Sequence, residues 1–77
     1  MRIELSKNNV VIVTWNYITY YGYVNKDKTD VPFVTSDHAR MKEYIEKTPG
    51  MIDMDFNVSL EKSATIRSAI MDKFCEV

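Results

Sequence analysis

Cysteine is almost absent from this sequence, because Cys75 stands alone among 77 residues. A lone cysteine forms no intramolecular disulfide, and one chain then lacks the thiolates of a structural zinc site. We therefore expect a protein of a reducing, intracellular compartment. Cys75 itself lies on an apolar stripe near the end of the sequence and is expected to be a buried, inert thiol.

Long apolar runs are absent as well. No segment approaches the roughly twenty apolar residues that cross a bilayer. The first ten residues, MRIELSKNNV, lack the apolar stretch of a signal peptide. These absences predict a mature, cytoplasmic protein that makes no contact with a membrane.

A surplus of basic residues is also missing. Ten lysines and arginines stand against eleven aspartates and glutamates, which gives a net charge of −1. Proteins that bind nucleic acid mainly by neutralising phosphates usually carry excess positive charge, so the composition disfavours that class. With 45% apolar and 27% charged residues, the composition is typical of a single globular domain, spanning residues 1–77.

What the sequence does contain is an apolar stretch from Val10 to Val24, VVIVTWNYITYYGYV. At period two, both of its faces are rich in β-branched and aromatic residues, which favour strand over helix. Fifteen residues exceed the usual strand length of about five or six. We therefore expect a bend near Thr14–Asn16 or a bulge at Gly22.

Alternation and turn residues place two short strands beside this stretch. Residues 2–5 alternate and are followed by a turn over 6–9, which predicts a hairpin with the long strand. A polar loop over 25–30 then leads to a strand over 31–35. Pro32 lacks an N–H group, so this strand should lie at an edge or begin at the proline.

Residues 52–58 alternate between apolar and polar side chains, which predicts a strand with one buried and one solvated face. The buried side would carry Ile52, Met54, Phe56 and Val58, and the solvated side would carry Asp53, Asp55 and Asn57. The three oxygen-bearing side chains resemble the start of a calcium loop. However, Val58 and Ala64 occupy the positions where that loop needs glycine and glutamate, so we expect no metal.

Two segments have helical periodicity. The first has Ser36 as its expected N-cap, runs from Asp37 to about Lys47 and ends at Pro49-Gly50. The second spans Leu60–Cys75, and its apolar residues form two stripes with Arg67 between them. The order β-β-β-α-β-α predicts a small α+β fold. It would be a two-layer sandwich with a mainly antiparallel sheet and both helices packed on one face.

Candidate binding residues come from the aromatic stretch and the second helix. A small core cannot contain rings on both sides of one strand, so some of them should be exposed, as is typical of protein interfaces. A guanidinium among apolar residues must reach an acid, extend to water or meet a partner, which makes Arg67 an ion-pair former or an interface hot spot. The predicted partner-binding residues are Trp15, Tyr17, Tyr21, Tyr23, Arg67 and Met71.

Residues suited to catalysis are few. His38 is the only histidine, and helix capping explains its neighbours Ser36 and Asp37. We therefore expect no enzyme, no catalytic residue and no cofactor. A small nuclease or toxin that uses His38 is a competing hypothesis, which predicts loss of activity in His38→Ala.

Together these observations predict a small protein-binding module, an inhibitor or adaptor that occupies the surface of a protein partner. A homodimer is also expected to be accessible, because a sheet edge and an apolar stripe lack partners. The free-standing size is typical of accessory proteins of phages or mobile elements. The alternative is a nucleic-acid-binding regulator that stacks bases on the tyrosine-rich strand, and oligonucleotide binding over a salt series separates the two hypotheses.

Overall fold

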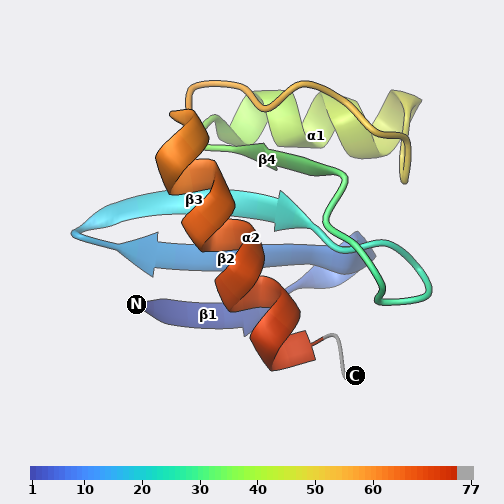
Figure 1. Cartoon of the computed structure of the whole chain (residues 1–77). Helices are drawn as coiled ribbons and strands as arrows, with labels where there is room; N and C mark the ends of the chain where they lie inside the picture. The colour runs from blue at the N-terminus through green and yellow to red at the C-terminus, as the bar shows by residue number, and fades with distance from the viewer. Residues whose placement is uncertain (75–77) are drawn as a thin grey trace.

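A four-stranded antiparallel sheet with two helices forms the fold, and its strands lie in the order of the chain (Figure 1). The computed structural model describes residues 1–74, so the expectation for Cys75 lies outside the described part. The elements are β1 (Arg2–Leu5), the 3₁₀ segment η1 (Lys7–Asn9), β2 (Val10–Trp15), β3 (Ile18–Tyr23), β4 (Phe33–Thr35), α1 (His38–Lys47) and α2 (Leu60–Phe74). The predicted α+β class and its mainly antiparallel sheet are confirmed. None of the helices in residues 1–74 is long and apolar enough to cross a membrane.

The aromatic stretch is two strands rather than one. β2 and β3 pair from Val10 with Tyr23 to Trp15 with Ile18, which leaves a two-residue turn between them. Both turn residues, Asn16 and Tyr17, have positive φ, at 52° and 65°, and this matches the backbone twist of a tight hairpin. The expected bend near Thr14–Asn16 is therefore a complete chain reversal.

Gly22 carries no bulge, because it pairs in register with Val11. Its role is to let α2 approach the sheet. A Cβ atom at this position would lie 2.5 Å from Cδ1 of Ile70, which is far inside van der Waals contact. The missing side chain therefore admits Ile70 to the core.

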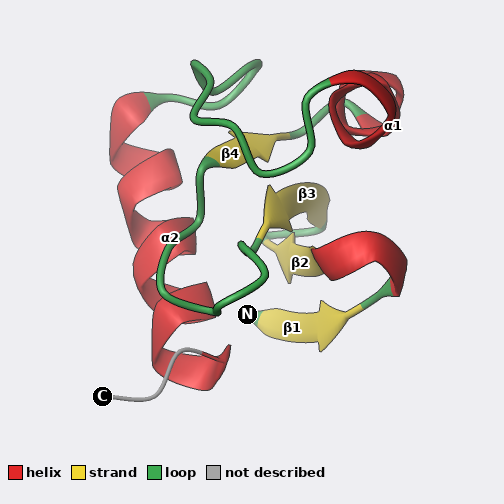
Figure 2. Cartoon of the chain, turned by 90° about the vertical axis from the view of Figure 1, so that its right-hand side faces the viewer, coloured by secondary structure: helices red, strands yellow, loops and turns green. Residues whose placement is uncertain are grey.

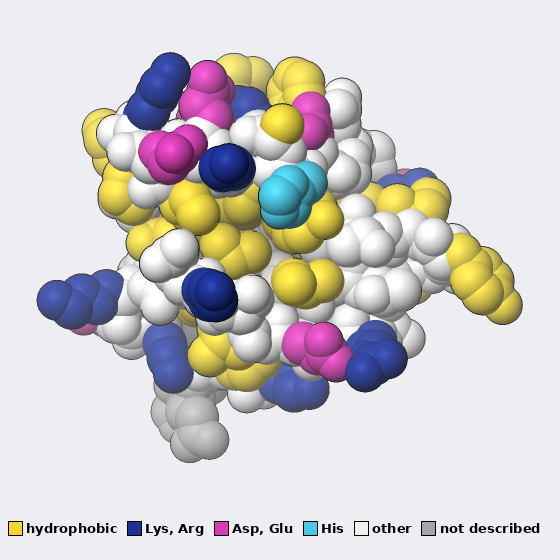
Figure 3. All heavy atoms as spheres, turned by 180° about the vertical axis from the view of Figure 1, so that it is seen from behind, with side chains coloured by type: hydrophobic (Ala, Val, Ile, Leu, Met, Phe, Trp, Pro, Cys, Tyr) yellow, Lys and Arg dark blue, Asp and Glu magenta, His cyan; other side chains and the backbone are white. Residues whose placement is uncertain are grey.

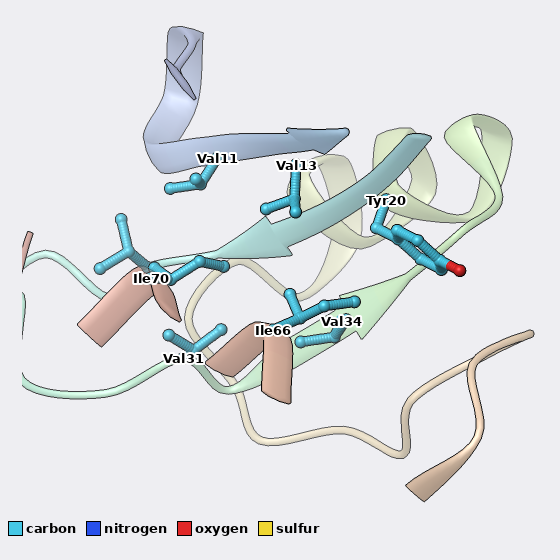
Figure 4. Packing of buried hydrophobic residues seen from close by; sticks show 8 residues of the cluster. Val11, Val13, Tyr20, Val31, Val34, Ile66 and Ile70 are labelled. Carbon is cyan, nitrogen blue, oxygen red and sulfur yellow. The ribbon is translucent and has the colours of Figure 1, made fainter. Parts of the chain in front are cut away.

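One face of the sheet is covered by α2. Because side chains alternate along a strand, Val11 and Val13 point to the same side and meet Ile66 and Ile70 of the helix (Figure 4). Both isoleucines are fully buried. The larger cluster comprises Val11, Val13, Tyr20, Val24, Val31, Val34, Ile66 and Ile70.

The opposite face is covered by α1, so the prediction that both helices pack on one face is wrong. Figure 2 shows the two helices on either side of the sheet. Met41 and Tyr44 of α1 pack with Val10, Tyr23 and Phe33 in a second cluster, and the rings of Phe33 and Tyr44 stack at 4.6 Å. The physical reason is that the strands are apolar on both faces, so each face of β4 needs its own cover.

The start of α1 also differs from the prediction. The carboxylate of Asp37 is the N-cap, accepting hydrogen bonds from the N–H groups of Ala39 (2.9 Å) and Arg40 (3.4 Å). Ser36 instead donates its hydroxyl to the carbonyl of Asn57 at 2.9 Å. The helix end at Lys47 is as predicted.

Residues 51–58 run beside β4 without forming the predicted strand. A single parallel bridge joins Phe56 to Thr35. The N–H groups of Asp53 and Phe56 donate to the carbonyls of Pro32 and Val34, at 3.2 and 3.1 Å. In a regular strand, every second residue bonds to the same neighbouring strand. These two donors lie three residues apart, so the pairing is irregular.

Candidate functional site

Over residues 52–56 the buried and exposed faces are the reverse of the sequence prediction, whereas Val58 packs against the core and Asn57 is exposed, as predicted. Ile52 and Met54 were expected to be buried, yet each is 85% exposed. Asp53 and Asp55 were expected on a solvated face, yet both are half-buried and bonded to arginines. Since side chains alternate along an extended segment, a shift of one residue exchanges the buried and the solvated side over residues 52–56.

Asp55 holds this segment to α2 and to β4. Its two carboxylate oxygens accept hydrogen bonds from the guanidinium of Arg67, at 2.6 and 2.7 Å. The Val34 N–H (2.9 Å) and the Ser63 hydroxyl donate to the same carboxylate. The Nε–H of Arg67 donates in turn to the carbonyl of Val31 at 2.8 Å. The segment is thereby connected to both neighbouring elements.

The contacts of Asp55 favour the ionised form of its carboxylate. Burial acts to raise the pKa of Asp55, but hydrogen bonds from Arg67, Ser63 and the Val34 N–H outweigh burial and hold the pKa below its ordinary value. The side chains of Asp55 and Arg67 are only 12% and 32% exposed. The local ion pair, one of the two roles expected for Arg67, is therefore what the structure contains.

Asp53 makes the corresponding contact with α1. Its carboxylate lies 2.7 Å from the Arg40 guanidinium. A hydrogen bond from the Met54 N–H and then the bond from Arg40 lower the pKa of Asp53. Nearby, the hydroxyl of Tyr44 donates to the carbonyl of Met51 at 2.6 Å. Residues 51–55 are thus fastened to α1 as well as to α2.

The consequence is a row of exposed apolar side chains, which we call the 51–60 ridge. Its members are 42% to 90% exposed: Met51, Ile52, Met54, Phe56 and Leu60. The connection that carries the ridge runs along the outer edge of the sheet, beyond β4 (Figure 1). Isolated apolar side chains are normal on a protein surface, whereas five exposed ones within ten residues make this connection a candidate interaction site.

The tip of the β2–β3 hairpin lies near one end of the ridge. Ile18, next to the tip, lines a shallow hollow together with Asn57 and Val58. Tyr17 at the tip is fully exposed, and its φ of 65° is unfavourable for a bulky side chain. A strained and exposed aromatic residue beside an apolar row extends the candidate surface.

The six predicted partner-binding residues do not form one surface. Trp15 and Met71 are half-buried and pack against the cluster beneath α2. Tyr23 is buried on the α1 side with its ring 5.2 Å from that of Tyr44. Tyr21 is half-buried, and Arg67 is bound to Asp55. Only Tyr17 of this set is fully exposed.

Sequence reasoning missed the ridge, although a signal for it was present. Arg40 and Arg67 lie on helices whose neighbouring faces are apolar, and each therefore requires an acid within reach. Asp53 and Asp55 are spaced two residues apart and so share one face of an extended segment. Pairing both acids with both arginines turns the alternate residues outward.

His38 and the acidic residues form no assembled chemical centre in the described residues. The exposed His38 ring lies edge-on to Tyr21 at 5.4 Å. Among residues 1–74, no group of three His, Cys, Asp or Glu side chains is placed to hold a metal ion. The hydroxyl of Ser36 and the carboxylate of Asp37 bond to backbone groups.

Comparisons with known proteins found no relative of this chain. No protein-family model, no curated protein and no solved structure matches this chain. Its function is therefore inferred from the surfaces described above.

Proposed function

We propose that this chain is a small protein-binding module, an inhibitor or adaptor that inserts its 51–60 ridge into an apolar groove of a protein partner. One observation carries the proposal: five large apolar side chains point outward from a segment whose carboxylates are held inward. Burying that row against a partner would remove apolar surface from water, which is the main driving force of protein association.

The ridge is held in place before any partner arrives. Asp53 is bonded to α1 and Asp55 to α2, so the backbone between them is restrained from both sides. Association then orders few additional degrees of freedom, and such preorganisation lowers the entropic cost of binding. A free loop of the same composition would lack this advantage.

The chemistry of the ridge defines the partner surface. The two carboxylates in this segment are neutralised by arginines, which leaves an apolar row without free charge. Because the row follows an outer edge of the molecule (Figure 1), a concave surface complements it better than a flat one. Two projecting ridges would meet only along a line, which favours a different protein over a second copy of this chain.

Site-specific photo-crosslinking tests the proposal. A benzophenone amino acid replaces Ile52 on the ridge or, as the control, Ser68 on the exposed side of α2. The purified proteins are irradiated in a lysate of the cells that produce the protein naturally. We expect a discrete adduct from position 52, none from position 68, and loss of the adduct when Met54→Asp is added.

The outcomes separate the competing hypotheses. Adducts of equal yield from positions 52 and 68, or an adduct that survives Met54→Asp, would contradict docking through the ridge. An adduct with the mass of two copies would replace the partner hypothesis with self-association, which sedimentation equilibrium of wild type and Met54→Asp would then verify. Because Met54 is 85% exposed, this substitution should change the free energy of unfolding by no more than about 0.5 kcal/mol.

A further inference from the structure

A second candidate site lies on the sheet face that α1 covers. Here a groove of about 450 Å³ opens between α1, η1 and strands β2 and β3. Figure 3 shows this face, with hydrophobic side chains open to view between separate basic side chains and the histidine at their margin. Its lining includes Lys7, Val10, Ile12, Tyr21, Met41 and Lys42.

The groove exists because the cover on this face is incomplete. α1 packs over Tyr23 and Phe33 of strands β3 and β4, and η1 lies on the same side of the sheet as α1 (Figure 2). Between the two helical segments, Ile12 and Tyr21 remain only half-buried. The floor is therefore apolar and accessible.

The rim of the groove is positively charged. Lys7 of η1 and Lys42 of α1 line it from two sides, and no aspartate or glutamate is among its lining residues. Within residues 1–74, neither lysine lies within ion-pair distance of a carboxylate. Both ammonium groups thus keep their charge available to a ligand.

Two carboxylates near the groove, those of Glu4 and Asp37, are engaged with other groups. Glu4 of β1 pairs across the sheet with Ile12 of the groove floor, but its carboxylate lies 2.8 Å from the guanidinium of Arg2. Asp37, next to His38, accepts hydrogen bonds from the first turn of α1. Neither acid therefore cancels the positive rim.

We propose that this groove binds a small organic anion, consisting of an apolar aromatic or aliphatic body and one carboxylate. The body would lie on Val10, Ile12 and Met41, and the carboxylate would meet the ammonium groups of Lys7 and Lys42. A volume of about 450 Å³ lies within the range of ligand sites, roughly 300 to 1,000 Å³. The site does not involve the 51–60 ridge, so it stands independently of the proposed partner surface.

The experiment is an NMR titration of the ¹⁵N-labelled full chain with 1-naphthaleneacetate. The matched control ligand is 1-naphthaleneacetamide, which has the same apolar body without the charge. We expect saturable shifts of the backbone amides around Ile12, Tyr21 and Met41. We also expect the carboxylate to bind about tenfold more tightly than the amide, since its charge adds an attraction that the amide lacks.

A pair of double variants assigns the charge effect to the rim. Lys7→Gln/Lys42→Gln should weaken binding of the carboxylate about tenfold and leave binding of the amide unchanged. The control Lys26→Gln/Lys62→Gln makes the same change in net charge at exposed positions outside the groove and should leave both affinities as in wild type. All four lysines are exposed, so the variants are expected to fold.

Several results would overturn the proposal. Equal affinity for the carboxylate and the amide would show that the lysines take no part. Shifts centred on residues 51–60, or shifts that do not saturate, would place the ligand elsewhere. A single-stranded oligothymidylate that displaces naphthaleneacetate and binds more tightly would favour the nucleic-acid hypothesis instead.

Discussion

The bond between Asp55 and Arg67 should contribute measurably to stability, and a double-mutant cycle tests this. The perturbations are Asp55→Asn, Arg67→Met and the two combined. Arg67→Met leaves a carboxylate that is only 12% exposed without a counter-charge. Removal of one partner from a buried pair costs about 3 to 5 kcal/mol, and we place this variant at about 3 kcal/mol because the Val34 and Ser63 hydrogen bonds remain.

Asp55→Asn should lower the free energy of unfolding somewhat less than Arg67→Met. Asp55→Asn keeps an oxygen for the Val34 N–H, and the 32% exposed Arg67 can turn its charge toward water, so we expect about 2 kcal/mol. In the double variant no unpaired charge remains. The loss in free energy of unfolding should therefore be about 3 kcal/mol, rather than the sum of the two single losses, about 5 kcal/mol. The coupling energy is then about 2 kcal/mol.

Urea unfolding followed by the fluorescence of Trp15 provides the assay, since this sole tryptophan lies half-buried at the edge of the core. A domain of this length should have a total stability of about 4 to 12 kcal/mol, so the single variants should still fold. The exposed pair Glu43 and Lys47, 3.4 Å apart, gives the control cycle, with an expected coupling of at most about 0.5 kcal/mol. If the loss in the double variant equals the sum of the losses in Asp55→Asn and Arg67→Met, the reasoning is refuted.

Three further predictions follow from single contacts. Lowering the pH should reduce the free energy of unfolding, because the pKa of Asp55 is lower in the folded state than in the unfolded chain. The stability that ionised Asp55 contributes is fully present above its ordinary pKa of roughly 3.9. It is lost as the pH falls through the lower pKa of the folded state. The difference between wild type and Asp55→Asn in urea titrations should therefore shrink below about pH 4, and a constant difference down to pH 2.5 would contradict this. Gly22→Ala should cost about 1 kcal/mol, because the new Cβ meets Cδ1 of Ile70, and Ile70→Val, which removes that atom, should cost less in this background than in wild type. Tyr17→Gly should raise the thermal midpoint by relieving about 1 kcal/mol of strain at its positive φ, and an unchanged or lower midpoint would contradict this.

The sequence was sufficient for elements whose signals are local. The helix over 38–47 follows from the spacing of Met41 and Tyr44 and from the Pro49-Gly50 stop, and only its cap was assigned one residue early. The reversal inside the aromatic stretch was partly foreseen, because the polar residues near Asn16 interrupt the apolar run. In each case the determining contacts lie within a few positions along the chain.

Where the prediction failed, distant contacts decided the outcome. Alternation in residues 52–58 fixes two faces but not which one is buried, and that choice depends on Arg40 and Arg67, which lie on other elements. Similarly, the adjacent residues Phe33 and Val34 are both fully buried, so each face of β4 requires its own cover. Local pattern alone cannot assign a helix to each face.

The inward-facing carboxylates also have an evolutionary consequence. Loss of Asp55 would leave Arg67 without its counter-charge, so descendants of this sequence should change Asp55 together with Arg67. Arg40 also lies 3.5 Å from Glu43, so the coupling of Asp53 to Arg40 should be weaker. Ile52 and Met54 carry no such constraint from the fold, since both are almost fully exposed. Natural variation could therefore retune the ridge toward new partners while the two charge pairs keep the same backbone presenting it.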